Sequence, residues 1–99
     1  MSKSATVNDI VDFAGPMPAA EALMPDAAKI LSGNPAQQVW NLYADKSEKF
    51  FAGIWEGEPG KWQVNYTEDE FCHLLTGWVV LTDISGSSRA FTAGDSFVI

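Results

Sequence analysis

The sequence predicts an all-β fold, a sandwich or barrel, preceded by an arm with one short helix. Short apolar stretches recur from residue 37 to residue 99, and turn clusters that contain glycine separate them. The amphipathic helices that would cover a parallel sheet are absent between these stretches. The chain has 99 residues and 46% apolar content, which is enough for one domain with a core.

Residues 1–36 differ in composition from the rest and are predicted to form an N-terminal arm. They carry four of the five prolines together with alanine-rich stretches of no sustained period. One short helix is expected over residues 26–32, because Asp26 can cap its first turn and Gly33 can end it. The apolar residues are too scattered to build a core alone. We therefore expect the arm to lie on the barrel or on a partner subunit.

The remaining residues, 37–99, are predicted to form the β domain, and alternation and turns define its first strands. Residues 37–43 alternate apolar with polar side chains and end at a polar turn. Residues 50–55 are rich in aromatics, and the turn cluster 56–60 ends them. A third strand is expected at residues 61–65.

Four further strands complete the pattern. Residues 70–75 follow an acidic turn, and their first residue is a glutamate. The strands at 78–82 and 88–91 flank a polar turn and are predicted to form a hairpin. The last apolar strand is expected at residues 96–99.

Glu70, at the head of its strand, is the main candidate functional residue. Alternation places Cys72 on the same face as Glu70 and His73 on the opposite face. Both faces are largely apolar, so we expect the strand to be covered on both sides. A buried carboxylate has to be paired, hydrogen-bonded, protonated or bound to a metal, because bare burial costs several kcal/mol. The alternative is a solvated residue of the acidic turn.

Four segments of the chain together resemble the cupin superfamily, and most closely its ureidoglycine aminohydrolase-like branch. The first cupin motif has six residues between a glutamate and a glycine, and Glu70 and Gly77 meet this spacing. The resemblance implies a jelly-roll β-barrel, or double-stranded β-helix, in which Glu70 faces an internal pocket and a glycine permits the following turn. The segments that carry the resemblance are residues 53–56, 59–62, 66–77 and 93–99.

Histidines that bind the metal in this superfamily are missing from the first motif. The positions before Glu70 that would hold them carry Gln63 and Asn65, or Val64 and Tyr66 under a shorter spacing. Amides are poor ligands for a transition metal. A divalent cofactor, manganese, is therefore implied only by the resemblance, with Glu70 as a weak candidate ligand, and the residues themselves predict no cofactor.

The predicted pocket is a site for a small molecule and includes no assigned catalytic residue. A thiol beside a carboxylate has a raised pKa, which argues against Cys72 as a nucleophile. Tyr66 and Trp62 could hold a planar or amide-bearing ligand by stacking, or they belong to the core. The predicted pocket residues are Glu70, Cys72, Tyr66, Trp62, Gln63 and Asn65.

In the family the second cupin motif continues into a proline and a further strand. Here the motif starts at Gly94, and the sequence reaches its last residue, Ile99, before that proline. A jelly roll without its last strands exposes a sheet edge and part of its core. We therefore expect this form to associate as a homodimer or to have reduced stability.

Charge and hydropathy restrict the partners. Thirteen acidic against six basic residues give a net charge of -7, which argues against nucleic acid or an anionic membrane as a partner. No apolar run is long enough to span a bilayer and no signal peptide begins the chain, so a cytoplasmic protein is expected. Three functions stay open: binding of a small polar metabolite, a metal-dependent enzyme acting on a small amide or ureide, which the resemblance implies, and assembly through dimerisation.

Overall fold

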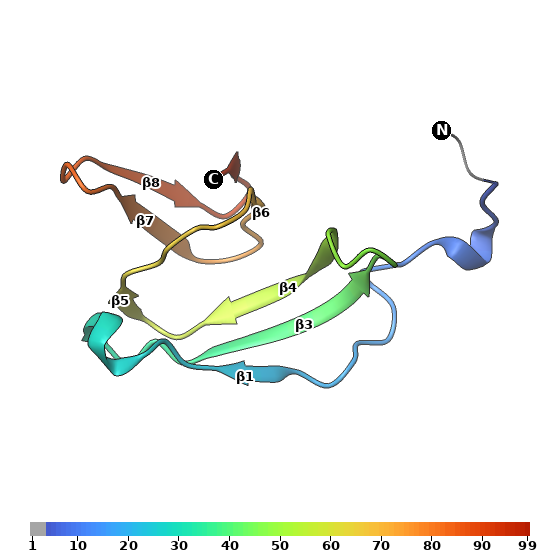
Figure 1. Ribbon diagram of the computed structural model, residues 1–99, viewed down its shortest axis with the longest axis horizontal. Coiled ribbons are helices and arrows are strands. Elements are labelled where there is room, and N and C mark those ends of the chain that lie inside the picture. Colours follow the sequence, from blue (N-terminus) through green and yellow to red (C-terminus); the bar gives the residue numbers. More distant parts are fainter. Residues whose placement is uncertain (1–3) are drawn as a thin grey trace. The chain divides into compact units, whose positions relative to one another are not determined.

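The computed structural model describes residues 4–99, which form short strands joined by turns (Figure 1). Its elements are nine strands and two single turns of 3-10 helix, and the described residues contain no α-helix. The prediction of an all-β fold is therefore confirmed. The chain divides into two compact units, Met1–Val64 and Asn65–Ile99, and each is described by itself.

The first unit contains a three-stranded antiparallel sheet in the order β1-β3-β4. Its strands are β1 (Glu21–Leu23), β3 (Gln37–Ala44) and β4 (Phe51–Gly57), so two of them match predicted strands. A register shift between Asn41 and Tyr43 interrupts the β3–β4 ladder. A separate two-stranded sheet pairs β2 (Ile30–Gly33) with β5 (Gly60–Trp62).

The helix predicted over residues 26–32 is wrong. Only Ala27–Lys29 form a single 3-10 turn, η2, and Asp26 makes no side-chain hydrogen bond that would cap it. From Ile30 the backbone continues into β2, which pairs with β5 some thirty residues later in the chain. This long-range pairing overrides the local helix signal, because intrinsic propensity is a weak preference. The other 3-10 turn, η1, spans Val7–Asp9.

The second unit consists of two antiparallel pairs, β6–β9 and β7–β8. The hairpin predicted from the sequence is confirmed, because β7 (Trp78–Thr82) pairs with β8 (Ser88–Thr92) in continuous register. The β6 strand (Phe71–His73) pairs with β9 (Ser96–Val98). Gly77 lies between β6 and β7 with φ of 76°, a conformation that favours glycine, as expected from the motif.

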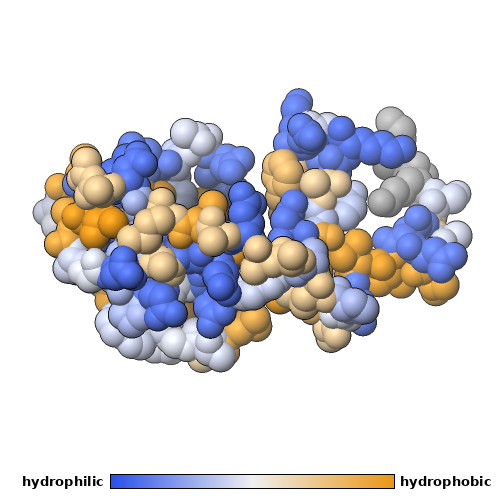
Figure 2. Space-filling model, turned by 90° about the horizontal axis from the view of Figure 1, so that it is seen from below, coloured by the Kyte–Doolittle hydropathy of each residue, from blue (hydrophilic) through white to orange (hydrophobic). Residues whose placement is uncertain are grey.

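Apolar side chains are widely exposed, and Figure 2 shows several patches of them on the face in view. Among the described residues no hydrophobic side chain belongs to a buried core, and only Pro35 is fully buried. Phe71 is 72% exposed and Leu75 is 66% exposed, so the expectation that both faces of this strand are covered is wrong. No helix in residues 4–99 is long and apolar enough to cross a membrane.

Candidate functional site

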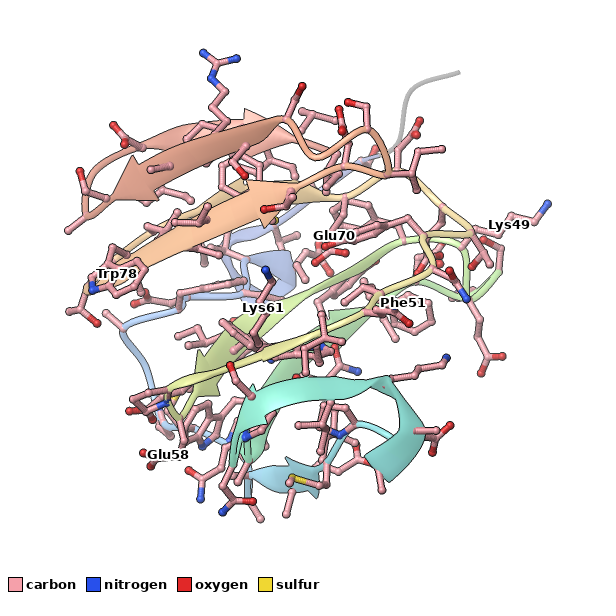
Figure 3. The ribbon with its side chains drawn as sticks, turned by 90° about the vertical axis from the view of Figure 1, so that its left-hand side faces the viewer. Lys49, Phe51, Glu58, Lys61, Glu70 and Trp78 are labelled. Atoms are coloured by element: carbon pink, nitrogen blue, oxygen red, sulfur yellow. The ribbon has the colours of Figure 1, made fainter. Side chains whose placement is uncertain are left out.

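Glu70 lies directly before β6, and its backbone extends the β6–β9 ladder by one residue (Figure 3). The Glu70 N–H donates to the Ile99 carbonyl over 2.8 Å, and the Ile99 N–H donates back to the Glu70 carbonyl over 2.9 Å. Cys72 is paired opposite Phe97 two residues further along the same ladder. Because side chains alternate along a strand, Glu70 and Cys72 share one face, as the sequence predicted.

Glu70 and Cys72 are in contact on this face, and Tyr66 interacts electrostatically with both. The Cys72 thiol donates a hydrogen bond to Oε1 of Glu70, with 3.8 Å between sulfur and oxygen. Partial burial raises the pKa of the Cys72 thiol, and the Glu70 charge and hydrogen bond raise it further. Partial burial also raises the pKa of Tyr66, with smaller contributions from Glu70 and Cys72. Both groups are therefore predominantly protonated at neutral pH, and neither is activated as a nucleophile.

The Glu70 cluster, defined as Tyr66, Glu70 and Cys72, is open to solvent. Tyr66 is 45% exposed, and Glu70 is also exposed, whereas Cys72 is half-buried. The carboxylate is therefore hydrated, which agrees with the alternative of a solvated residue of the acidic turn. The cluster thus presents one carboxylate acceptor, one thiol and one phenol.

The other three predicted pocket residues are Trp62, Gln63 and Asn65, and they lie outside the Glu70 cluster. Trp62 ends β5 in the first unit, where its ring centroid lies 6.4 Å from that of Trp55. Gln63 also belongs to the first unit, and its backbone N–H donates to the Lys29 carbonyl over 2.9 Å. Asn65 is an exposed loop residue that begins the second unit. Of the six predicted residues, the structure places three in the Glu70 cluster.

His73 lies on the opposite face of β6, as predicted, and pairs with Ser96 of β9. Its Nδ1 atom is 2.6 Å from the Ser96 hydroxyl oxygen. Both residues are exposed, so this cross-strand hydrogen bond is a surface contact that supports the register of two short strands.

The donor atoms for a manganese site do not come together in the described part of the chain. Residues 4–99 contain no group of three His, Cys, Asp or Glu side chains placed to hold a metal ion. Glu70 and Cys72 supply two donors, and manganese prefers a larger set of oxygen ligands. The residues present therefore do not fit a manganese site, and no chemical step is derived through one.

Sequence reasoning missed the partners that β9 brings to this face. Phe97 and Ile99 lie opposite Cys72 and Glu70, and Phe91 of β8 stacks on Phe97 with ring centroids 4.3 Å apart. Only the antiparallel register of β6 and β9 places these residues beside Glu70. The alternation in residues 96–99 indicates that Phe97 lies on one face of a strand, but it does not identify the strand that pairs with it.

Comparison with protein families places these strands in a known group. The model of the EutQ-like cupin domain matches residues 44–99, which include β4 to β9 and the whole Glu70 cluster. The chain belongs to the EutQ-like cupin domain family. The resemblance to the cupin superfamily and the jelly-roll class is therefore confirmed, whereas the closer likeness to ureidoglycine aminohydrolase stays a prediction. No curated protein matches the chain.

Proposed function

We propose that this EutQ-like cupin domain binds a small polar metabolite through the Glu70 cluster. The observation that carries the proposal is the contact between the Cys72 thiol and the Glu70 carboxylate on one face of the β6–β9 ladder, with Tyr66 near enough to interact electrostatically with both. The Glu70 carboxylate accepts hydrogen bonds and favours a ligand with N–H donors. Tyr66 offers an aromatic ring against which a planar group can stack. A net charge of -7 adds a field that attracts cations over anions.

These features favour a planar, cationic or amide-bearing nitrogen compound. An amidinium or guanidinium group presents two parallel N–H donors, which match the two oxygens of a carboxylate. The ligand would replace the thiol hydrogen bond of Cys72 at Oε1, and the thiol would turn to another acceptor. Binding is proposed without catalysis, because neither the thiol nor the phenol is activated. The metal-dependent alternative requires ligands that residues 4–99 do not bring together.

Benzamidine is a suitable probe, because it combines an amidinium with a planar ring. Isothermal titration should show saturable binding that is at least fivefold weaker in the Glu70→Gln variant, which keeps the size of the side chain and removes its charge. Fivefold corresponds to about 1 kcal/mol, the upper range for an exposed ion pair.

Glu68→Gln is the matched control for this experiment, because it removes the same charge from the same acidic turn. We expect this variant to weaken benzamidine binding by less than twofold. Equal losses in both variants would mean that benzamidine responds only to the net charge of the protein, and the proposed site would then be abandoned.

A second candidate function, assembly as a homodimer, is favoured by the exposed apolar side chains. Phe71, Trp78 and Val98 are each more than two-thirds exposed, and contiguous apolar surface on soluble proteins commonly marks an interface. Size-exclusion chromatography with light scattering over a hundredfold range of concentration tests this proposal. A dimer mass that falls toward 10.8 kDa on dilution is expected, and a constant monomer mass would exclude it.

A further inference from the structure

A hollow in the Asn65–Ile99 unit is lined mainly by apolar side chains and by one cation. Its volume is about 430 Å³, which lies within the range of roughly 300 to 1,000 Å³ that small-molecule sites occupy. None of the residues of the Glu70 cluster lines it. Its lining includes Leu81, Arg89, Phe91, Phe97 and Ile99.

The apolar wall of this hollow is preorganised. Phe91 and Phe97 stack with their centroids 4.3 Å apart and their ring planes 24° apart. Both rings are half-buried, which leaves part of each to contact a ligand. Leu81 and Ile99 are also half-buried and add aliphatic surface. Because the rings support each other, an apolar body can pack here with little ordering of the protein.

Arg89 is the only arginine of the chain. Its guanidinium carbon lies 5.5 Å from the centroid of the Phe91 ring, a cation–π contact. Within residues 4–99 no carboxylate forms an ion pair with it. A guanidinium stays charged at all relevant pH values and presents donors that fit a carboxylate in bidentate fashion.

Two acidic residues on turns of this unit, Asp83 and Asp95, accept hydrogen bonds from the backbone of their own turns. Oδ1 of Asp83 accepts hydrogen bonds from the Ser85 and Ser87 N–H groups, at 2.8 and 3.1 Å. Oδ2 of Asp95 accepts from the Thr92 N–H over 2.8 Å. These contacts hold both carboxylates in their turns, so neither is paired with Arg89.

We propose that this hollow binds a small monocarboxylate with an aromatic or branched apolar body. The carboxylate would form a bidentate pair with Arg89, and the body would pack against Phe91 and Phe97. A single guanidinium neutralises one negative charge, whereas a dianionic phosphate would keep an excess charge within an acidic protein. The carboxylate class is thus favoured over phosphate esters. This inference uses residues outside the Glu70 cluster and does not depend on the proposed function.

Phenylacetate is the probe for this site, and its binding is followed by titration with detection of amide chemical shifts. We expect saturable binding, with shifts centred on the residues that line the hollow. Arg89→Gln should weaken binding at least fivefold, and Arg89→Lys should weaken it less, because it keeps the charge and loses the bidentate geometry. Lys61→Gln is the matched control, since it removes one positive charge from the other unit, and it should change binding by less than twofold.

Two ligand controls on the unaltered protein keep the test valid even if the Arg89 variants fold poorly. The neutral analogue 2-phenylacetamide should bind at least fivefold more weakly than phenylacetate, and phenyl phosphate should also bind more weakly. The proposal is overturned if phenylacetate does not saturate, or if Arg89→Gln and Lys61→Gln have equal effects. It is also overturned if the amide binds as well as the acid, or if phenyl phosphate binds more tightly.

Discussion

The contact between Glu70 and Cys72 predicts a measurable change in the reactivity of the chain's single cysteine. Glu70 raises the pKa of the Cys72 thiol through its charge and its hydrogen bond, after the larger effect of burial. Replacing Glu70 by glutamine removes that negative charge, lowers the pKa of the thiol and increases the thiolate population at neutral pH. The reaction of Cys72 with iodoacetamide, which consumes the thiolate, should therefore become faster.

The size of this effect follows from the 3.8 Å between Sγ of Cys72 and Oε1 of Glu70. Because Glu70 is exposed, the dielectric constant of water is the appropriate one, and two unit charges at this distance repel by about 1 kcal/mol. That energy changes the thiolate population by about sixfold. A less basic thiolate is also a weaker nucleophile, with a Brønsted coefficient of about 0.5, so the net acceleration is about threefold.

Mass spectrometry of the alkylated protein at pH 7 measures the rate directly. The Glu68→Gln variant removes an equal charge from the preceding turn and should alter the rate by less than 1.5-fold. A Glu70→Gln variant that reacts no faster than the original protein would refute the contact between Glu70 and Cys72. An equal acceleration in both variants would show a general charge effect without a specific pair.

Three further predictions concern stability and assembly. Hydrogen bonds from Ser85 hold the pKa of Asp83 below its usual value. The ionised Asp83 therefore stabilises the protein at pH values above its usual pKa, and this stabilisation is lost as the pH falls through the lowered pKa. In the Asp83→Ala variant the melting temperature, followed by circular dichroism, should fall less steeply at acid pH, and an unchanged dependence on pH would contradict this. Gly33→Ala should destabilise the protein in urea by about 2 to 4 kcal/mol, because φ is 73° and a Cβ would lie 2.9 Å from Gly60 Cα. Gly86→Ala is the control, because φ is 89° there and an added Cβ would have no atom within 4 Å. It should lower the free energy of unfolding by about 1 to 2 kcal/mol, and equal losses in the two variants would exclude an effect of the contact with Gly60. If the second candidate function holds, Phe71→Ser should lower the dimer mass seen by light scattering at a fixed concentration, and an unchanged mass would place the interface elsewhere.

Local signals predicted most of the strands. The alternation in residues 37–43 and the hairpin around residues 83–87 depend on neighbouring residues, and the structure contains both elements. The helix expected at residues 26–32 failed for the opposite reason, since β2 exists through its pairing with β5. Short segments with mixed propensity are decided by their partners in space, and a single sequence does not identify these partners.

In the candidate site, too, the sequence predicted the features that depend on neighbouring residues and missed those that depend on partners distant in the chain. That Glu70 and Cys72 share a face follows from strand alternation alone, and the hydrogen bond between them agrees with it. The sequence left Trp62 either as a stacking residue of the pocket or as part of the core, and in the structure its ring lies beside that of Trp55. Arg89 carried no signal, because one arginine on a hairpin resembles an ordinary surface residue until its neighbours are known.

The exposure of Glu70 limits how much this carboxylate can contribute to binding a ligand. A buried carboxylate must have a partner, and its presence alone would indicate a metal, a proton or a ligand. An exposed one is satisfied by water, so a ligand gains only the difference between its own hydrogen bonds and those of water, about 1 kcal/mol for an exposed pair. Selective binding therefore has to draw on Tyr66, whose ring can contribute apolar contact that water does not replace. A Tyr66→Ala variant should consequently weaken benzamidine binding at least as much as Glu70→Gln does, and a smaller loss would locate the ligand away from the cluster.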